Sequence, residues 1–210
     1  MYNFYAFLGR MKYIDRWSLM HSIKKENIME HSQEVAIITH ALCLIKNKMF
    51  NGKLNVEKAL LLALYHEVGE VITGDLPTPI KYFNSEIQSA YKDLEVKACE
   101  KLLNMLPDEL KEEYRESILP DKNIEEAKIV KYADKISAYI KCLEELKQGN
   151  SEFKKAESTI KKAIKEYDSE EVNYFMDNFV GAYKLTLDEL DWKKHPNRGV
   201  FYRLLIEIYY

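Results

Sequence analysis

The stretch Leu60-Leu-Leu-Ala-Leu-Tyr-His66-Glu67-Val-Gly-Glu70 decides how this chain is interpreted. It begins as an apolar helical run, and at helical spacing Ala63, His66 and Glu70 lie on one face. Buried carboxylates are costly unless they are paired or bound to a cation, and the run holds no lysine or arginine to pair with them. The stretch therefore predicts a helix whose end carries metal ligands.

Two other residues of metal-binding type stand outside this stretch, His31 and Asp134. Asp134 lies on the more apolar side of a lysine-rich helical segment. A lone inward histidine is more often a core residue than a ligand, by about two to one, and Glu67 and Glu70 alone would suit a solvated helix face. Because histidines or carboxylates occur on apolar helix faces in three separate places, a metal site is favoured over unrelated structural roles. We expect one divalent metal ion held by His31, His66, Glu67 and Asp134, and such ligands favour Mn, Fe, Co or Zn over Ca or Mg.

The bulk properties limit the class of protein. The 210 residues fit one domain or two small ones, 47% of them are hydrophobic, and the net charge is −3. A net negative charge gives no sign of the basic surface that binds a nucleic acid polymer. The three cysteines suggest no pairing, no signal peptide is evident, and no apolar run approaches the ~20 residues that span a bilayer. We expect a cytoplasmic protein without a membrane partner.

Helical periodicity recurs along the whole chain, while alternating β patterns are nearly absent. Asn27 and Ser169 are candidate N-caps. One clear apolar stripe consists of Val35, Ile38, Leu42, Ile45 and Met49. Further helical segments are expected near residues 86–105, 123–147, 151–167 and 170–190. The pattern predicts an all-α domain of about eight or nine helices.

Two features near the expected ligands are candidates for binding substrate. A loop of residues 73–83 follows the stretch directly, and its glycine and prolines end the helix and stiffen the chain. Alone it would be an ordinary connection, but it offers an acceptor, a hydroxyl and a cation in Asp75, Thr78 and Lys81. The pair Arg16-Trp17 offers a planar fork for phosphate and a flat face for a base or sugar. Composition alone favours a core tryptophan and a surface arginine.

Taken with their surroundings, these residues carry a resemblance to the HD-domain metal-dependent phosphohydrolases, and within them to bacterial 5′-deoxynucleotidases of the YfbR type. The likeness covers about residues 4–190. Its stretches are Ile14–Met20, Glu30–Ala36, Leu64–Glu70, Thr73–Pro79, Lys81–Ser85, Lys131–Lys135, Lys141–Leu146, Tyr174–Met176 and Leu185–Glu189.

The resemblance implies an all-helical HD-domain bundle, typically a homodimer. It implies removal of phosphate from deoxyribonucleoside 5′-monophosphates, discrimination against ribonucleotides, and support by cobalt, manganese or a similar divalent ion. His31, His66 and Asp134 would match metal ligands, and Glu70 the acidic catalytic residue. The remaining matches are Arg16 for orienting the phosphate, Trp17 for the sugar, and Asp75, Leu76, Pro77 and Thr78 for the substrate-binding segment. We count Arg16 and Asp75 as catalytic too, and Glu67 and Lys81 as substrate contacts.

The pair that names the superfamily is His-Asp, and here it is His66-Glu67. Glutamate carries one more methylene, which moves the carboxylate by roughly one bond length and adds a rotor. A displacement of ~1 Å can cost ~100-fold in rate. Three interpretations stay open: the 5′-deoxynucleotidase, another HD phosphohydrolase acting on nucleoside triphosphates, and a nucleotide-binding protein whose metal site Glu67 has weakened. The triphosphate enzyme would need more cations than Arg16 and Lys81.

The tail after residue 190 departs from the resemblance. Residues 192–210 are rich in aromatic side chains. An apolar stripe there consists of Val200, Phe201, Leu204, Leu205 and Ile208. We expect an HD-type domain over residues 1–190 and a C-terminal extension over residues 191–210 that forms a docking helix.

Overall fold

The structure is a computed structural model that describes residues 1–190, and within this part the chain is helical without a β-strand. The all-α prediction is confirmed. The predicted docking helix of residues 191–210 lies outside the described residues. The longer helices are α2 (Ile28–Met49), α3 (Val56–Tyr65), α6 (Ser85–Leu103), α7 (Asp108–Ile118), α8 (Glu125–Lys147), α9 (Lys154–Lys165) and α10 (Glu170–Asn178). The short ones are α1 (Phe4–Leu8), α4 (Glu70–Thr73), α5 (Thr78–Lys81), and the 3₁₀ turns η1 (Met11–Tyr13), η2 (Ser151–Phe153) and η3 (Val180–Lys184).

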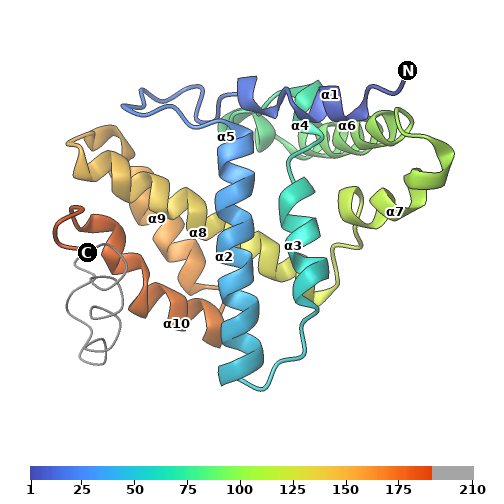
Figure 1. Ribbon diagram of the computed structural model, residues 1–210. Coiled ribbons are helices and arrows are strands. Elements are labelled where there is room, and N and C mark those ends of the chain that lie inside the picture. The colour runs from blue at the N-terminus through green and yellow to red at the C-terminus, as the bar shows by residue number, and fades with distance from the viewer. Residues whose placement is uncertain (191–210) are drawn as a thin grey trace, which may run out of the picture.

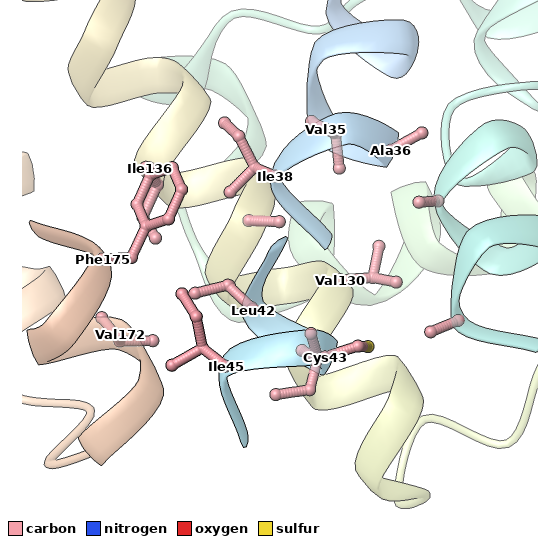
Figure 2. Close-up of a cluster of buried hydrophobic side chains, with 14 of the residues drawn as sticks. Val35, Ala36, Ile38, Leu42, Cys43, Ile45, Val130, Ile136, Val172 and Phe175 are labelled. Carbon is pink, nitrogen blue, oxygen red and sulfur yellow. The ribbon is translucent and has the colours of Figure 1, made fainter. Parts of the chain in front are cut away.

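Helix α2 stands at the centre of the molecule, with α3 beside it and α8 and α10 packed against it (Figure 1). Its predicted stripe forms the core, where Ile38, Leu42 and Ile45 face side chains from α8 and α10 (Figure 2). Each such buried side chain contributes about 1.5–3 kcal/mol. The stripe was predicted one turn too long, because Met49, the last residue of α2, is 50% exposed.

The predicted N-caps had different outcomes. The Asn27 side chain accepts hydrogen bonds from the backbone N–H groups of Met29 and Glu30, at 3.1 and 3.0 Å. Ser169 occupies the N-cap of α10, but its hydroxyl makes no capping hydrogen bond. Because Asn27 fixes the start of α2, it also fixes His31 near the first turn of that helix.

One helix boundary and one whole helix differ from the prediction. Helix α10 ends at Asn178, and the separate turn η3 follows it, where one segment over 170–190 was expected. Helix α7 was not expected. Its apolar stripe comprises only Leu110, Tyr114 and Ile118 at helical spacing, and the other residues are mostly charged or polar, so the segment as a whole is strongly hydrophilic.

The predicted continuous helix through His66 and Glu70 is wrong. Helix α3 ends at Tyr65, and α4 begins at Glu70. Between the two helices the backbone hydrogen bonds join residues three apart instead of four. The Glu70 N–H, for example, donates to the Glu67 carbonyl at 3.0 Å. Gly69 is a poor helix former, and a Cβ there would lie 3.1 Å from the Sγ of Cys99 on α6. The absence of a side chain at Gly69 therefore lets this turn approach α6 closely.

Candidate metal centre and substrate site

The four predicted ligands converge. His31 comes from α2, His66 and Glu67 from the turn after α3, and Asp134 from α8, and one donor atom from each lies within 4.8 Å of all the others. Metal–ligand bonds for imidazole and carboxylate are about 2.0–2.2 Å long, so atoms this close can share one ion. The break between α3 and α4 does not prevent this convergence.

His66 offers a free lone pair to this group. Its Nδ1 lies 2.7 Å from the carbonyl oxygen of Ala63, which only accepts, so Nδ1 carries the proton and donates. Its Nε2 is buried and has no hydrogen-bond partner among the described residues. Burial lowers the pKa of His66, which keeps the imidazole neutral. A buried nitrogen lone pair that no donor satisfies is what a metal ligand requires, so the donor set fits a metal ion.

Asp134 supplies a fixed negative charge. Burial alone would raise its pKa, but a hydrogen bond with His31 and the nearby positive charge of Arg16 hold the pKa below its usual value. The Oδ1 of Asp134 lies 3.0 Å from the Nε2 of His31. The carboxylate therefore stays ionised, as a ligand must be.

A chain of hydrogen bonds supports His31 from its other side. The Nδ1 of His31 lies 3.1 Å from the Oγ of Ser137, and that hydroxyl donates to the Oε2 of Glu34 at 2.5 Å. Because the hydroxyl proton goes to Glu34, the Ser137 oxygen accepts from Nδ1–H of His31. The Nε2 on the other side of the ring contacts Asp134, and it would have to exchange any proton there for a bound metal ion. Such outer partners fix the tautomer and ring orientation of a metal-binding histidine.

Arg16 lies beside the ligand group. Its Nη1 is 3.6 Å from the Oε1 of Glu67, and its side chain is only 13% exposed, which differs from the surface position that composition favoured. Burial would lower the pKa of Arg16, but Asp134, Glu67, Glu26 and further acidic neighbours raise it. A permanent cation thus stands next to the candidate metal centre.

Glu70 is the first residue of α4 and is 5% exposed. Burial, together with the charges of Glu67 and Asp75, raises the pKa of Glu70 far above its usual range. Its Oε2 is buried without a hydrogen-bond partner among the described residues. In the metal-free protein this carboxyl group therefore holds a proton at neutral pH.

The predicted loop of residues 73–83 contains the short helix α5. Gly74 ends α4 at a φ of +73°, a conformation that glycine adopts without strain. Burial raises the pKa of Asp75, against the opposing effects of Arg16 and of a backbone hydrogen bond from Trp17. Lys81 forms an ion pair with Glu95 of α6 at 3.0 Å, so this cation already has a partner. Leu76 and Pro77 are half-buried, and Thr78 is exposed.

A cavity of about 770 Å³ opens beside the ligand group. Pockets for small molecules typically measure about 300–1,000 Å³, so the volume is large enough for a nucleotide, but neither Arg16 and Trp17 nor the segment from Asp75 to Lys81 lines it. One part of its wall is formed by His66, Glu67, Glu70 and Asp134. Apolar side chains from several helices line the rest, together with four lysines: Lys92, Lys122, Lys128 and Lys131.

Comparison with known proteins decides the family. The family described as 5′-deoxynucleotidase YfbR-like matches residues 3–183. This chain belongs to that family. A 5′-deoxynucleotidase of Vibrio cholerae is 51% identical over 189 residues, which is 90% of this chain and 97% of that protein. A 5′-deoxynucleotidase of Photorhabdus temperata is 51% identical over 192 residues, with the same coverage.

The solved structures agree with the fold. An HD-domain phosphohydrolase of Listeria innocua superposes with a TM-score of 0.77 over 86% of this chain and 88% of its own, at 22% sequence identity. At this identity the likeness concerns the fold alone. Together with the family match, it confirms the predicted HD-domain helical fold and the predicted resemblance. Among the described residues no helix combines the length and hydropathy that a membrane span needs.

Sequence reasoning missed three residues of this YfbR-like site. Glu34 and Ser137, which support His31, and Glu26, which contacts Arg16, were not among the predicted residues. A signal was present for two of them, because Glu34 lies three residues after His31 and Ser137 three after Asp134. At that spacing on a helix each side chain lies next to the candidate ligand on its own helix.

Proposed function

We propose that this YfbR-like protein hydrolyses deoxyribonucleoside 5′-monophosphates to deoxynucleoside and phosphate, with one divalent metal ion held by His31, His66, Glu67 and Asp134. The observation that carries the proposal is the convergence of these four donors within 4.8 Å. It occurs in a chain whose relatives at about half identity are named 5′-deoxynucleotidases.

The metal requirement rests on the chemistry of the donors. Two imidazoles with two carboxylates suit cobalt, manganese, iron or zinc, and we propose cobalt or manganese. When bound, such an ion polarises a phosphate oxygen and lowers the pKa of a bound water towards ~7. The chain's own residues supply the remaining roles.

Arg16 orients the phosphate. Its Nε donates to Glu26, and its Nη1 points towards Glu67, so the outer edge of the guanidinium keeps N–H donors for substrate oxygens. Two parallel N–H···O bonds from an arginine fix a phosphate in direction as well as in position. In-line attack on phosphorus needs this rigidity.

Glu70 delivers a proton to the leaving 5′-oxygen. Burial and neighbouring carboxylates keep it protonated in the metal-free protein, and added positive charge nearby moves its pKa down towards the range in which a general acid works. Asp75 carries a catalytic role through Arg16, whose charge faces it. We assign the contacts with the sugar to Trp17 and to the segment of Leu76, Pro77 and Thr78.

The lysines of the cavity favour a second candidate, hydrolysis of nucleoside triphosphates. The sequence alone offered only Arg16 and Lys81 as cations, whereas the cavity wall adds Lys92, Lys122, Lys128 and Lys131. Additional phosphates need additional cations. The third interpretation, a nucleotide-binding protein weakened by Glu67, is not favoured, because a Glu67 oxygen lies within the donor group.

We also propose that the protein is a homodimer, as the family resemblance implies. The surface at α5 exposes large apolar side chains, with Tyr82 63% and Phe83 74% exposed, and a second copy could cover them. Sedimentation equilibrium tests this, and a mass of one chain at micromolar concentration contradicts it.

The substrate class is tested by phosphate release. The purified protein is given Co²⁺ or Mn²⁺ and a panel of deoxy- and ribonucleoside 5′-mono- and triphosphates, with His66→Ala as the control. We expect release from deoxymononucleotides, much less from ribonucleotides, and none with the variant. Release from triphosphates alone would replace the first candidate by the second, and no release from any nucleotide would refute both.

A further inference from the structure

Residues 16–26 form an arm that carries Arg16 and Trp17, and this arm is tied to the start of α2. An antiparallel bridge joins Asp15 to Asn27, and the N–H of Arg16 donates to the carbonyl of Glu26 at 2.8 Å. In Figure 1 this arm runs across the end of α2 from which the chain enters the helix. Arg16 and Glu26 are therefore backbone partners.

The far side of the arm is fixed to α8. The buried Glu145 carboxylate accepts the N–H groups of Ile23 and Lys24 at 2.9 and 3.2 Å. Asn150 adds a hydrogen bond to the carbonyl of His21 at 2.7 Å. With both sides anchored, residues 16–26 form a frame that can hold side chains in place.

Within this frame a single oxygen joins the two side chains that we assign to the substrate. The Oε2 of Glu26 accepts from the Nε of Arg16 at 3.0 Å and from the indole Nε1 of Trp17 at 3.1 Å. The Glu26 side chain is 14% exposed, so water competes little for these bonds. Both are charge-assisted, and such bonds are roughly twice as strong as neutral ones.

Trp17 needs this support. Its φ is +60°, which is uncommon for a bulky residue and persists only where the surroundings impose it. Its ring packs on Phe153 with centroids 5.3 Å apart, and its backbone bonds to Asp75. Glu26 is the contact that fixes the indole relative to Arg16.

We propose that Glu26 is a positioning residue that sets the guanidinium of Arg16 and the indole of Trp17 at a fixed separation, and so couples phosphate binding to selection of the deoxyribose. The proposal rests on the proposed function, because Arg16 binds the phosphate and Trp17 borders the sugar there. Glu26 itself touches no substrate atom. A carboxylate that only neutralised Arg16 would affect phosphate binding and leave sugar selection unchanged.

The test is Glu26→Gln, which keeps the size of the side chain but loses the charge that strengthens both bonds. We expect kcat/KM for deoxyadenosine 5′-monophosphate to fall about tenfold, mainly through KM, and the deoxy-to-ribo ratio to fall at least threefold. Asp15→Asn is the control, because Asp15 lies next to the same arm in an exposed pair with Lys25 at 2.7 Å. We expect it to leave both quantities unchanged.

A second readout does not depend on turnover. In a Trp192→Phe background, Trp17 is the one remaining tryptophan. We expect Glu26→Gln to shift its fluorescence emission and increase its quenching by iodide. Should Glu26→Gln not fold, Glu26→Asp keeps the charge but withdraws the carboxylate by one methylene, and it should lower the same ratio and change the same emission.

The outcomes separate the two proposals. An unchanged ratio together with unchanged Trp17 emission in the folded variant overturns the role of Glu26. If the wild type releases no phosphate from any nucleotide, the proposed function fails, and the fluorescence alone then decides whether Glu26 holds Trp17. Equal loss for deoxy- and ribonucleotides with altered emission would reduce Glu26 to a structural residue and overturn its role in selecting the sugar.

Discussion

Removing the hydroxyl of Ser137 should weaken metal binding without removing any ligand. In Ser137→Ala, the Nδ1–H of His31 loses its acceptor and the Glu34 carboxylate loses its donor, which lay at 3.1 and 2.5 Å from the Ser137 Oγ. A hydrogen bond to a charged group contributes about 1.5–3 kcal/mol, and the ring of His31 becomes free to turn or to change tautomer. Loss of such an outer partner typically costs about 10–100-fold in metal affinity, or about 1.4–2.8 kcal/mol.

The assay is competition for Co²⁺ between the metal-free protein and a chromophoric chelator. Ser32→Ala is the matched control, because Ser32 is buried next to His31 on α2 and its Oγ has no hydrogen-bond partner among the described residues. We expect wild-type affinity for this control. The reasoning is refuted if Ser137→Ala binds Co²⁺ within twofold of the wild type, or if Ser32→Ala loses as much.

Three further predictions concern single carboxylates. Glu67→Asp restores the His-Asp pair and should keep turnover within about tenfold of the wild type, so a larger loss in a steady-state assay would mean that the local backbone needs the longer side chain. Glu70→Gln should lose ~10²–10⁴-fold in kcat at unchanged Co²⁺ affinity, and weaker Co²⁺ binding would make Glu70 a ligand. Although Glu145 is buried, hydrogen bonds from Lys141 and from backbone N–H groups lower its pKa from 4.5 to about 2. The ionised Glu145 therefore contributes its full stabilisation above pH 4.5, and this contribution is lost as the pH falls towards 2. Glu145→Gln lacks this carboxylate and should melt at a lower temperature than the wild type at neutral pH. Between pH 4.5 and pH 2, however, its melting temperature should fall less than that of the wild type.

Local patterns were sufficient for much of the fold. The apolar stripe of α2 and the capping oxygen of Asn27 depend on residues a few positions apart, and the sequence shows both. The convergence of the four candidate ligands could be anticipated for a related reason, because the apolar run before His66 and Glu67 holds no cation that could pair with buried carboxylates.

What the sequence did not show depends on contacts between distant segments. The break after Tyr65 depends on Gly69 lying against Cys99 of another helix. Lys81 is held by Glu95 across the turn between α5 and α6, which its position in the predicted loop does not indicate. The bonds of Glu26 to Arg16 and Trp17 require the arm to fold back, and no periodicity predicts that.

The central claim is that turnover of deoxymononucleotides depends on one metal ion held by His31, His66, Glu67 and Asp134. It is tested most directly by stripping the protein with a chelator and measuring phosphate release from deoxyadenosine 5′-monophosphate as Co²⁺ is added back. Our account predicts no release from the stripped protein, a rise that reaches its plateau at one ion per chain, and no rise for His66→Ala. Full turnover by the stripped protein, or an equal rise for His66→Ala, would contradict it.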